Sequence, residues 1–128
     1  MKNFGVGVDI EDISRFTEAN AGENYQELLS RIFSKKELKY CFSKRYPAQH
    51  LSARYSGKEA VIKAVSSIMH EPIFYNNIEI LNDKNGVPRV KIAGRRSRGF
   101  QIFVSLSHCK DKSIAFAIAR IHSQCRKT

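Results

Sequence analysis

The sequence predicts an α+β fold in which an antiparallel sheet packs with one long helix. Three observations lead to this class. Residues 4–10 are apolar and interrupted by glycines, as in a strand. A helical pattern extends from Pro47 to Met69. After Pro72 the pattern changes to short alternating runs separated by turn residues, which is typical of strands and hairpins.

The N-terminal third contains one strand and two helical stretches. Gly5 and Gly7 indicate that the strand over residues 4–10 is buried under close backbone contacts. A short helix is expected over residues 12–18 and a second over residues 23–32.

Helix boundaries are clearest in the middle of the chain. Ser34 and Glu37 have the spacing of a capping box, which predicts a helix that begins there and ends near Ser43. Pro47 suits the first turn of the next helix, which we expect to continue to Met69.

The C-terminal half is expected to form the sheet. Asn85-Gly86 favours a hairpin turn, and Lys110-Asp111-Lys112 favours another turn. No repeat or linker interrupts the chain, so residues 1–128 are expected to form a single domain. The strands are expected over residues 77–81, 89–93, 101–107 and 114–121.

The composition is that of a globular protein with a strong positive charge. Hydrophobic residues make up 42% and charged residues 27% of the chain. Lys and Arg number 22 against 12 Asp and Glu, which gives a formal net charge of +10. Such a surface favours an anionic partner, and nucleic acid, an anionic membrane, a polyphosphate ligand and an acidic protein all fit.

Cysteine usage and hydropathy indicate a cytoplasmic, soluble protein. The three cysteines are scattered and lack zinc-ligand spacing, which favours free thiols in a reducing compartment. The N-terminus has no apolar stretch of signal-peptide length. No segment approaches the roughly 20 apolar residues of a membrane span, so membrane insertion is not expected.

Two acidic residues lie at the end of the first strand. Asp9 and Glu11 are two positions apart, so their side chains point to the same face. Two oxygen ligands on one side suit a hard cation such as Mg²⁺, although Mn²⁺ favours the same ligands. The alternative is a helix N-cap at Asp12 with solvated acidic neighbours.

The long helix carries a Glu–Lys pair on a face of small polar residues. Glu59 and Lys63 are i,i+4 neighbours. The alternative is a solvated face with a modest surface ion pair. The small neighbours, which favour a ligand site because they leave room beside the pair, are Ser52, Ser56, Ser66 and His70.

His108 ends a predicted strand beside a basic turn. It can act as a phosphate ligand or a base there, or be a surface histidine without a role. Ser107 and His108 face apart because they are adjacent in a strand, which argues against a nucleophile pair.

Taken together, these segments resemble the holo-acyl-carrier-protein synthases, a branch of the phosphopantetheinyl transferase superfamily. The matches occur in family order and span nearly the whole chain. They are Gly5-Val6-Gly7-Val8-Asp9-Ile10, Phe33-Ser34-Lys35-Lys36-Glu37-Leu38, the run from Leu51 to Ala64 containing Lys58-Glu59-Ala60, Asn85-Gly86-Val87-Pro88, and Val104-Ser105-Leu106-Ser107-His108.

The resemblance implies the 4′-phosphopantetheinyl transferase fold and a Mg²⁺-dependent reaction in fatty acid biosynthesis. The 4′-phosphopantetheine arm of coenzyme A would pass to a serine of an apo-acyl carrier protein, releasing adenosine 3′,5′-bisphosphate. It also implies a homotrimer with active sites between subunits.

The resemblance also implies roles for individual positions. Asp9 and Glu59 would hold the metal and, with Lys63, form the catalytic group. Arg15 would face the acidic carrier protein. Whether Glu59 or a water molecule accepts the serine proton stays open. The residues expected beside the coenzyme A phosphates are Arg54, Lys58, Lys63 and His108.

Two features depart from the common family pattern. Tyr55-Ser56-Gly57 stands where Phe-Ala-Ala is usual, and Gly57 costs roughly 1 kcal/mol of helix propensity relative to Ala. Glu11 occupies a position where the larger, two-lobed branch has a third acidic ligand. The sequence leaves open whether Glu11 binds metal here.

A nucleic-acid-binding domain is the main alternative, and a catalytically inactive scaffold is the second. The net charge and the run Arg95-Arg96-Ser97-Arg98 favour the first. Against it, the chain has no recognised nucleic-acid motif, and the acidic pair would repel phosphates unless a metal intervened. We therefore expect no nucleic-acid partner.

Overall fold

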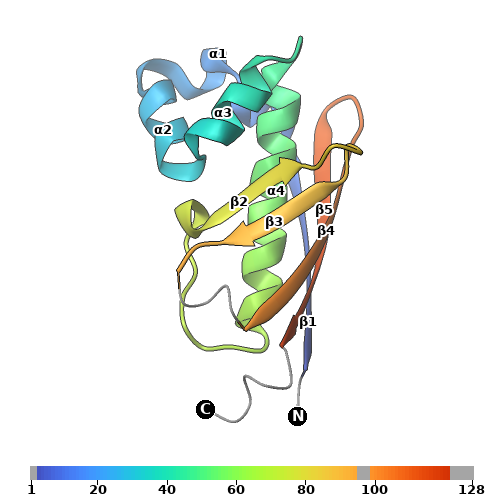
Figure 1. Cartoon of the computed structure of the whole chain (residues 1–128). Coiled ribbons are helices and arrows are strands. Elements are labelled where there is room, and N and C mark those ends of the chain that lie inside the picture. The colour runs from blue at the N-terminus through green and yellow to red at the C-terminus, as the bar shows by residue number, and fades with distance from the viewer. Residues whose placement is uncertain (1–2, 95–98, 122–128) are drawn as a thin grey trace.

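The computed structural model describes residues 3–94 and 99–121 and has the expected α+β architecture (Figure 1). The strands are β1 (Phe4–Asp12), β2 (Ile78–Asn82), β3 (Pro88–Ile92), β4 (Phe100–His108) and β5 (Lys112–Ile121). The helices are α1 (Glu18–Ala21), α2 (Tyr25–Ile32), α3 (Lys35–Phe42) and α4 (Pro47–Ser66), with short 3₁₀ turns η1 (Ile13–Phe16), η2 (Gly22–Asn24) and η3 (Tyr75–Asn77).

The long helix α4 lies between two antiparallel sheets. A three-stranded sheet of order β1-β5-β4 covers one side, and the β2–β3 hairpin crosses the other (Figure 1). Helices α1, α2 and α3 gather around the N-terminal half of α4. One apolar core lies between α4 and the sheets, and a second lies under α2 and α3.

Local sequence signals account for the helix starts. Ser34 and Glu37 form the predicted capping box at the start of α3. Helix α4 begins at Pro47 as predicted, but it ends at Ser66 rather than at Met69. Among the described residues, no helix is long and apolar enough to cross a membrane.

Glycines on β1 allow α4 to lie close to the sheet. Gly5 and Gly7 face the helix opposite Ala119 and Ala117 of β5. A Cβ atom at Gly7 would collide with the carbonyl oxygen of Ala60. The predicted close backbone contact is therefore confirmed.

Replacing Gly7 with alanine is expected to reduce the free energy of unfolding by about 1–3 kcal/mol or more, because the clash is with helix backbone. Urea denaturation measures the loss. Gly57→Ala is the matched control. Its Cβ would meet only side-chain methyls of Ile80 and Leu106, at 2.7 and 3.0 Å, and roughly 1 kcal/mol of helix propensity offsets that crowding. Equal losses in the two variants would contradict this account.

The opposite face of the same sheet is apolar and open. The expectation that residues 4–10 are buried is wrong for this side of β1, because no element among the described residues covers it. The outward side chains are between 42% and 62% exposed, and they are Phe4, Val6, Val8, Ile10, Phe103, Ile114 and Phe116.

Candidate functional site

The acidic end of β1 lies against α4. Asp9 and Glu11 both point to the helix side of the strand, as the period of two predicts. Lys63 of α4 reaches the same place: its Nζ donates to the carbonyl oxygen of Val8 at 2.9 Å and lies 3.6 Å from Asp9 Oδ1. The other carboxylate oxygen, Asp9 Oδ2, is buried and has no hydrogen-bond partner. Asp9 therefore has one oxygen available for a further ligand.

The environment of Asp9 disfavours its charged form. Burial, followed by the nearby Glu11 carboxylate, raises the pKa of Asp9 from 3.8 to about 7. Lys63 opposes this shift and Glu59 adds to it. A cation bound to the free oxygen would relieve the repulsion among these carboxylates.

Glu59 completes the group from the adjacent turn of α4. It is half-buried, and its Oε1 accepts a hydrogen bond from the hydroxyl of Tyr75. The Tyr75 hydroxyl lies 3.1 Å from that of Tyr55. Burial and the bond to Glu59 raise the pKa of Tyr75, so it remains a donor. Sequence analysis named Tyr55 only as a departure from the family pattern. It missed Tyr75, because η3 has no motif that points to Glu59.

These residues fit a Mg²⁺ ion that takes two protein carboxylates. Within residues 3–94 and 99–121, no group of three or more His, Cys, Asp or Glu side chains is arranged to hold a metal. Mg²⁺ commonly binds one or two carboxylates and completes its shell with water and substrate phosphates. The unpartnered oxygen of Asp9 and the carboxylate of Glu59 supply such a set.

Glu11 has another partner. Its Oε1 lies 3.0 Å from Nη1 of Arg15, which is one turn further along the chain. The Arg15 guanidinium also lies over the ring of Tyr55, 5.0 Å from the ring centroid. The structure thus connects the residue expected to face the carrier protein with the tyrosine pair beside Glu59.

Lys58 is not a phosphate ligand, and that expectation is corrected. Its side chain is fully buried, and its Nζ lies 2.7 Å from Glu37 Oε1. The same nitrogen donates to the carbonyl oxygens of Ile32, Tyr75 and Ile78 at 2.7, 3.1 and 2.7 Å. An ammonium with four acceptors inside the protein cannot reach a ligand at the surface.

The N-terminal part of the small polar face of α4 is covered as well. Ser52 and Ser56 are fully buried, and every residue from 51 to 58 is buried. Their small size allows neighbouring elements to pack closely, and does not leave room for a ligand as we expected. The face reaches solvent only from Glu59 onward, at Glu59, Lys63 and Ser66.

A second cluster, of basic and aromatic side chains, surrounds Tyr40. The Arg54 guanidinium lies 4.1 Å and Lys44 Nζ 4.9 Å from the centroid of the Tyr40 ring, and the His50 ring lies 5.8 Å from it. Burial, then Arg54, Lys44 and His108, lower the pKa of His50. His108 therefore belongs to the same positively charged neighbourhood. We call these five residues the Tyr40 cluster.

The Tyr40 cluster has the features of an anion site. Arg54 is 2% exposed, and its Nε is buried without a partner. Arginine forks and histidines bind phosphate oxygens well. Sequence analysis identified Arg54 and His108 but missed Tyr40, Lys44 and His50. The only available signal for these three was the mixture of aromatic and basic residues from α3 to the first turn of α4.

The two clusters lie on different sides of α4. Arg54 and Glu59 are five residues apart, which corresponds to about 140° around a regular helix. A ligand that contacted both would have to reach around a helix that is buried at this level.

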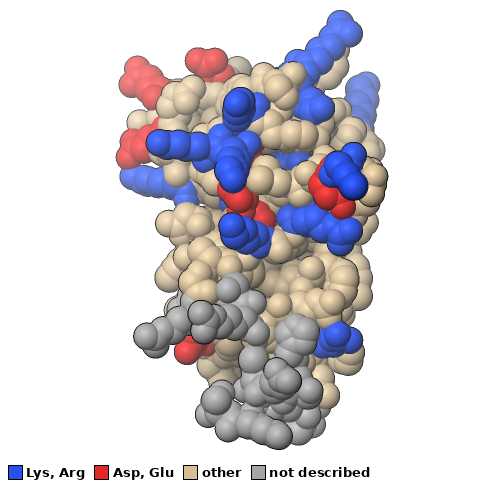
Figure 2. Space-filling view, in the orientation of Figure 1, with Lys and Arg blue, Asp and Glu red and all other residues tan. Residues whose placement is uncertain are grey.

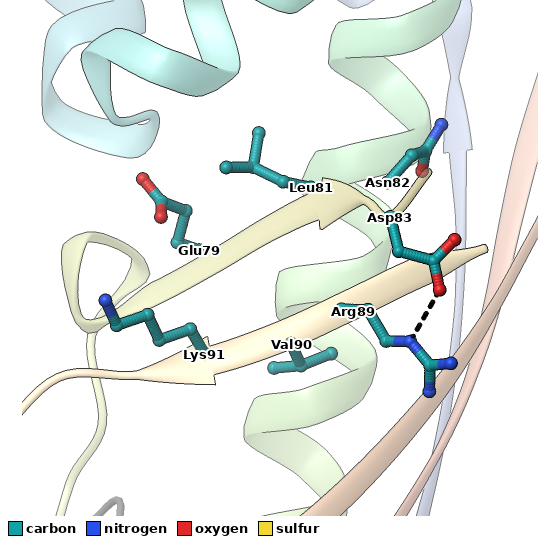
Figure 3. Close-up of a pocket in the computed structure, with 7 residues that line it drawn as sticks. All are labelled: Glu79, Leu81, Asn82, Asp83, Arg89, Val90 and Lys91. Carbon is teal, nitrogen blue, oxygen red and sulfur yellow. Dashed lines mark hydrogen bonds and ion pairs between the residues drawn. The ribbon is translucent and has the colours of Figure 1, made fainter. Parts of the chain in front are cut away.

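A hollow of about 240 Å³ lies on the outer side of the β2–β3 hairpin (Figure 3). At its end Asp83 Oδ2 accepts a hydrogen bond from Arg89 Nε at 3.0 Å, and the two side chains point toward each other. Asp83 Oδ1 accepts from the backbone N–H groups of Asn85 and Val87, which lowers the pKa of Asp83. These bonds fix the predicted Asn85-Gly86 turn. Neither Asp9 nor Glu59 lines this hollow.

Positive charge gathers on the face shown in Figure 2. Lys and Arg side chains are most frequent over α3 and the hairpin turn, and a group of acidic side chains lies at the corner of α1 and α2 (Figure 2). The basic run at residues 95–98 lies outside the described residues. The exposed cations of α3 and the loop after it are Lys35, Lys36, Lys39, Lys44 and Arg45.

The fold and these side chains define an α+β protein with two carboxylates beside a lysine and a separate basic and aromatic cluster around Tyr40. The model of the 4′-phosphopantetheinyl transferase superfamily matches residues 5–119. The chain belongs to this superfamily.

Within the superfamily, the chain is similar to several proteins named holo-[acyl-carrier-protein] synthase. A holo-[acyl-carrier-protein] synthase of Protochlamydia amoebophila is 39% identical over 117 residues, which cover 89% of this chain and 95% of the relative. One from Geotalea daltonii is 37% identical over 121 residues, covering 90% and 96%. Among solved structures, an ACPS–CoA complex of Chronobacterium ammoniagenes superposes with a TM-score of 0.78 at 26% identity, covering 94% of this chain and 99% of that one.

Proposed function

We propose that this chain is a holo-[acyl-carrier-protein] synthase. It transfers the 4′-phosphopantetheine group of coenzyme A to a serine of apo-acyl carrier protein and releases adenosine 3′,5′-bisphosphate. The observation that carries the proposal is the meeting of Asp9, Glu59 and Lys63 at one place in a chain of this superfamily. Residues 1–128 act as a single phosphopantetheinyl transferase domain.

Asp9 and Glu59 hold a Mg²⁺ ion in this proposal. When bound, the ion neutralises charge on the pyrophosphate oxygens of coenzyme A. In this proposal Glu11 serves as the partner of Arg15, which contacts its Oε1, and the two metal ligands are Asp9 and Glu59.

Lys63 supplies a cation beside the carboxylates. Its ammonium is anchored to Val8 and half-exposed, so it can reach a phosphate without leaving β1. There it stabilises the negative charge that develops as the phosphoanhydride bond breaks. The nucleophile belongs to the carrier protein, so the chain itself needs no catalytic serine.

Coenzyme A also carries a phosphate away from the reacting bond, and the Tyr40 cluster suits that group. Arg54 and His108 bind it, and Lys44 and His50 add positive charge. Carrier proteins are acidic, so the exposed cations of α3 and the loop after it attract them, with Arg15 at the docking site. The described cysteines, Cys41 and Cys109, are free thiols, which fits the cytoplasmic location that we propose.

The chain functions as a homotrimer with active sites between subunits. The open apolar face of the β1-β5-β4 sheet supports this assembly, because a large exposed apolar patch marks an interaction surface. The opposed positions of Arg54 and Glu59 also support it. One coenzyme A molecule can contact both clusters if they come from neighbouring subunits.

Mass spectrometry of an apo-acyl carrier protein tests the transfer. With this protein, coenzyme A and Mg²⁺ present, the carrier is expected to gain the phosphopantetheine mass while adenosine 3′,5′-bisphosphate appears. Omitting coenzyme A is the control. An unchanged mass with several carrier proteins would contradict the proposed function.

Subunit complementation tests the shared site. Glu59→Gln and His108→Glu are each expected to inactivate the cluster in which they lie. Mixed trimers formed by co-expression should recover about a quarter of wild-type activity, because some interfaces then combine one intact cluster from each variant. Mixing with no recovery would contradict a site made by two subunits.

A further inference from the structure

The Glu59 carboxylate is held by two hydroxyl groups, that of Tyr55 in helix α4 and that of Tyr75 in η3. The Tyr75 hydroxyl contacts Glu59 Oε1 and also lies 3.1 Å from the Tyr55 hydroxyl. A phenol has one hydrogen, and a carboxylate can only accept. Tyr75 therefore donates to Glu59, and Tyr55 donates to Tyr75.

Each tyrosine is fixed independently of Glu59. The backbone carbonyl of Tyr75 accepts a hydrogen bond from the buried Nζ of Lys58 at 3.1 Å, which ties η3 to α4. The Tyr55 ring is buried, with its centroid 5.2 Å from that of Phe16 and 5.0 Å from the guanidinium of Arg15. The hydroxyl that reaches Glu59 thus comes from a rigid support.

The two carboxylate oxygens of Glu59 have different surroundings. Oε1 accepts a hydrogen bond from the hydroxyl of Tyr75, whereas Oε2 accepts none from the described residues. Outer hydrogen bonds of this kind orient a ligating carboxylate and tune its affinity for the metal.

We propose that Tyr75, supported by Tyr55, is a positioning residue that holds Glu59 by Oε1 and presents Oε2 to the metal. This inference rests on the proposed function, since it assigns Glu59 to the metal. It concerns a residue in η3, which lies outside all five matched motifs.

Tyr75→Phe removes only the hydroxyl, and Tyr46→Phe is the matched control. Tyr46 is 61% exposed and its ring lies near Arg45, outside the hydroxyl chain. For Tyr75→Phe we expect the Mg²⁺ concentration at half-maximal transfer to rise about 10- to 100-fold, with near-normal turnover at saturating Mg²⁺. Tyr46→Phe should match the wild type.

A spectroscopic measurement tests the same point without turnover. The chain has five tyrosines and no tryptophan, so tyrosine dominates the protein's own near-ultraviolet absorption once the spectrum of coenzyme A and Mg²⁺ without protein is subtracted. With coenzyme A present and carrier absent, added Mg²⁺ should change the tyrosine spectrum of the wild type and of Tyr46→Phe. The change should be lost or strongly reduced in Tyr75→Phe.

The outcomes separate the two claims. No transfer by the wild type would contradict the proposed function itself. An active wild type with an unchanged Mg²⁺ requirement in Tyr75→Phe would overturn only the positioning role. Loss of folding in Tyr75→Phe would also overturn it, because the hydroxyl would then be structural. Tyr55→Phe is expected to raise the Mg²⁺ requirement by a smaller factor, and no change there would exclude Tyr55 from the chain.

Discussion

Replacing Lys58 with methionine is expected to lower the free energy of unfolding by about 3–5 kcal/mol. The ammonium is completely buried and has Glu37 as its charged partner. Removing it would leave the Glu37 carboxylate buried without a counter-ion, and would leave the carbonyls of Ile32 and Ile78 without this donor. Chemical denaturation followed by circular dichroism measures the loss.

The Glu37 partner provides the control for this prediction. Glu37 Oε1 also accepts from the backbone of Ser34, and Oε2 accepts from the backbone of Ile80. Adding Glu37→Gln to Lys58→Met removes the unpaired charge. The double variant should therefore be less destabilised than the sum of the two single variants. Additive losses, or a loss below 1 kcal/mol in Lys58→Met, would contradict a buried ion pair.

Replacing Lys63 with methionine is expected to reduce activity strongly and stability only slightly, the reverse of the effect at Lys58. Transfer should fall by about 10²–10³-fold, the scale seen when one charge-stabilising group is removed from an active site. Stability should change by only about 0–1 kcal/mol, because the Lys63–Asp9 pair is partly exposed. Steady-state kinetics and denaturation of the same preparation measure the two effects.

Lys58→Met and Lys63→Met thus serve as controls for each other, because the two lysines lie on the same helix. Lys63→Arg is a further control, since it keeps the charge and should retain more activity than Lys63→Met. A Lys63→Met protein with normal turnover would remove Lys63 from the reaction.

Much of the fold could be predicted because its signals are local. The capping box of Ser34 and Glu37 marks the start of α3, and Pro47 marks the start of α4. The two-residue period of β1 gave the shared face of Asp9 and Glu11. These features depend on neighbours within a few positions, which the sequence displays directly.

The role of Lys58 could not be predicted in this way. It stands beside Glu59 in a motif, yet its partners come from residues 32, 37, 75 and 78. The sequence does not record that these four places meet around one nitrogen. The same reason explains the burial of Ser52 and Ser56, since helical spacing defines a face but not what covers it.

In the candidate site, too, the residues in local motifs could be predicted and those brought in by tertiary contacts could not. Asp9, Glu59 and Lys63 were identified from motifs, and helical spacing relates the last two. Tyr75, Lys44 and His50 enter through tertiary contacts of a 3₁₀ turn, a loop and the first turns of α4. Their identification required the structure.

The most direct test of the account measures Mg²⁺-dependent transfer to an apo-acyl carrier protein by the wild type, Asp9→Asn and Glu59→Gln. Each substitution keeps the size of the side chain and removes one negative charge from the proposed metal site. We predict that the wild type converts the carrier completely to the heavier form and that no conversion occurs after the metal is chelated. Either variant should give at most trace conversion while remaining folded. Full conversion by either folded variant would contradict a metal site formed by Asp9 and Glu59.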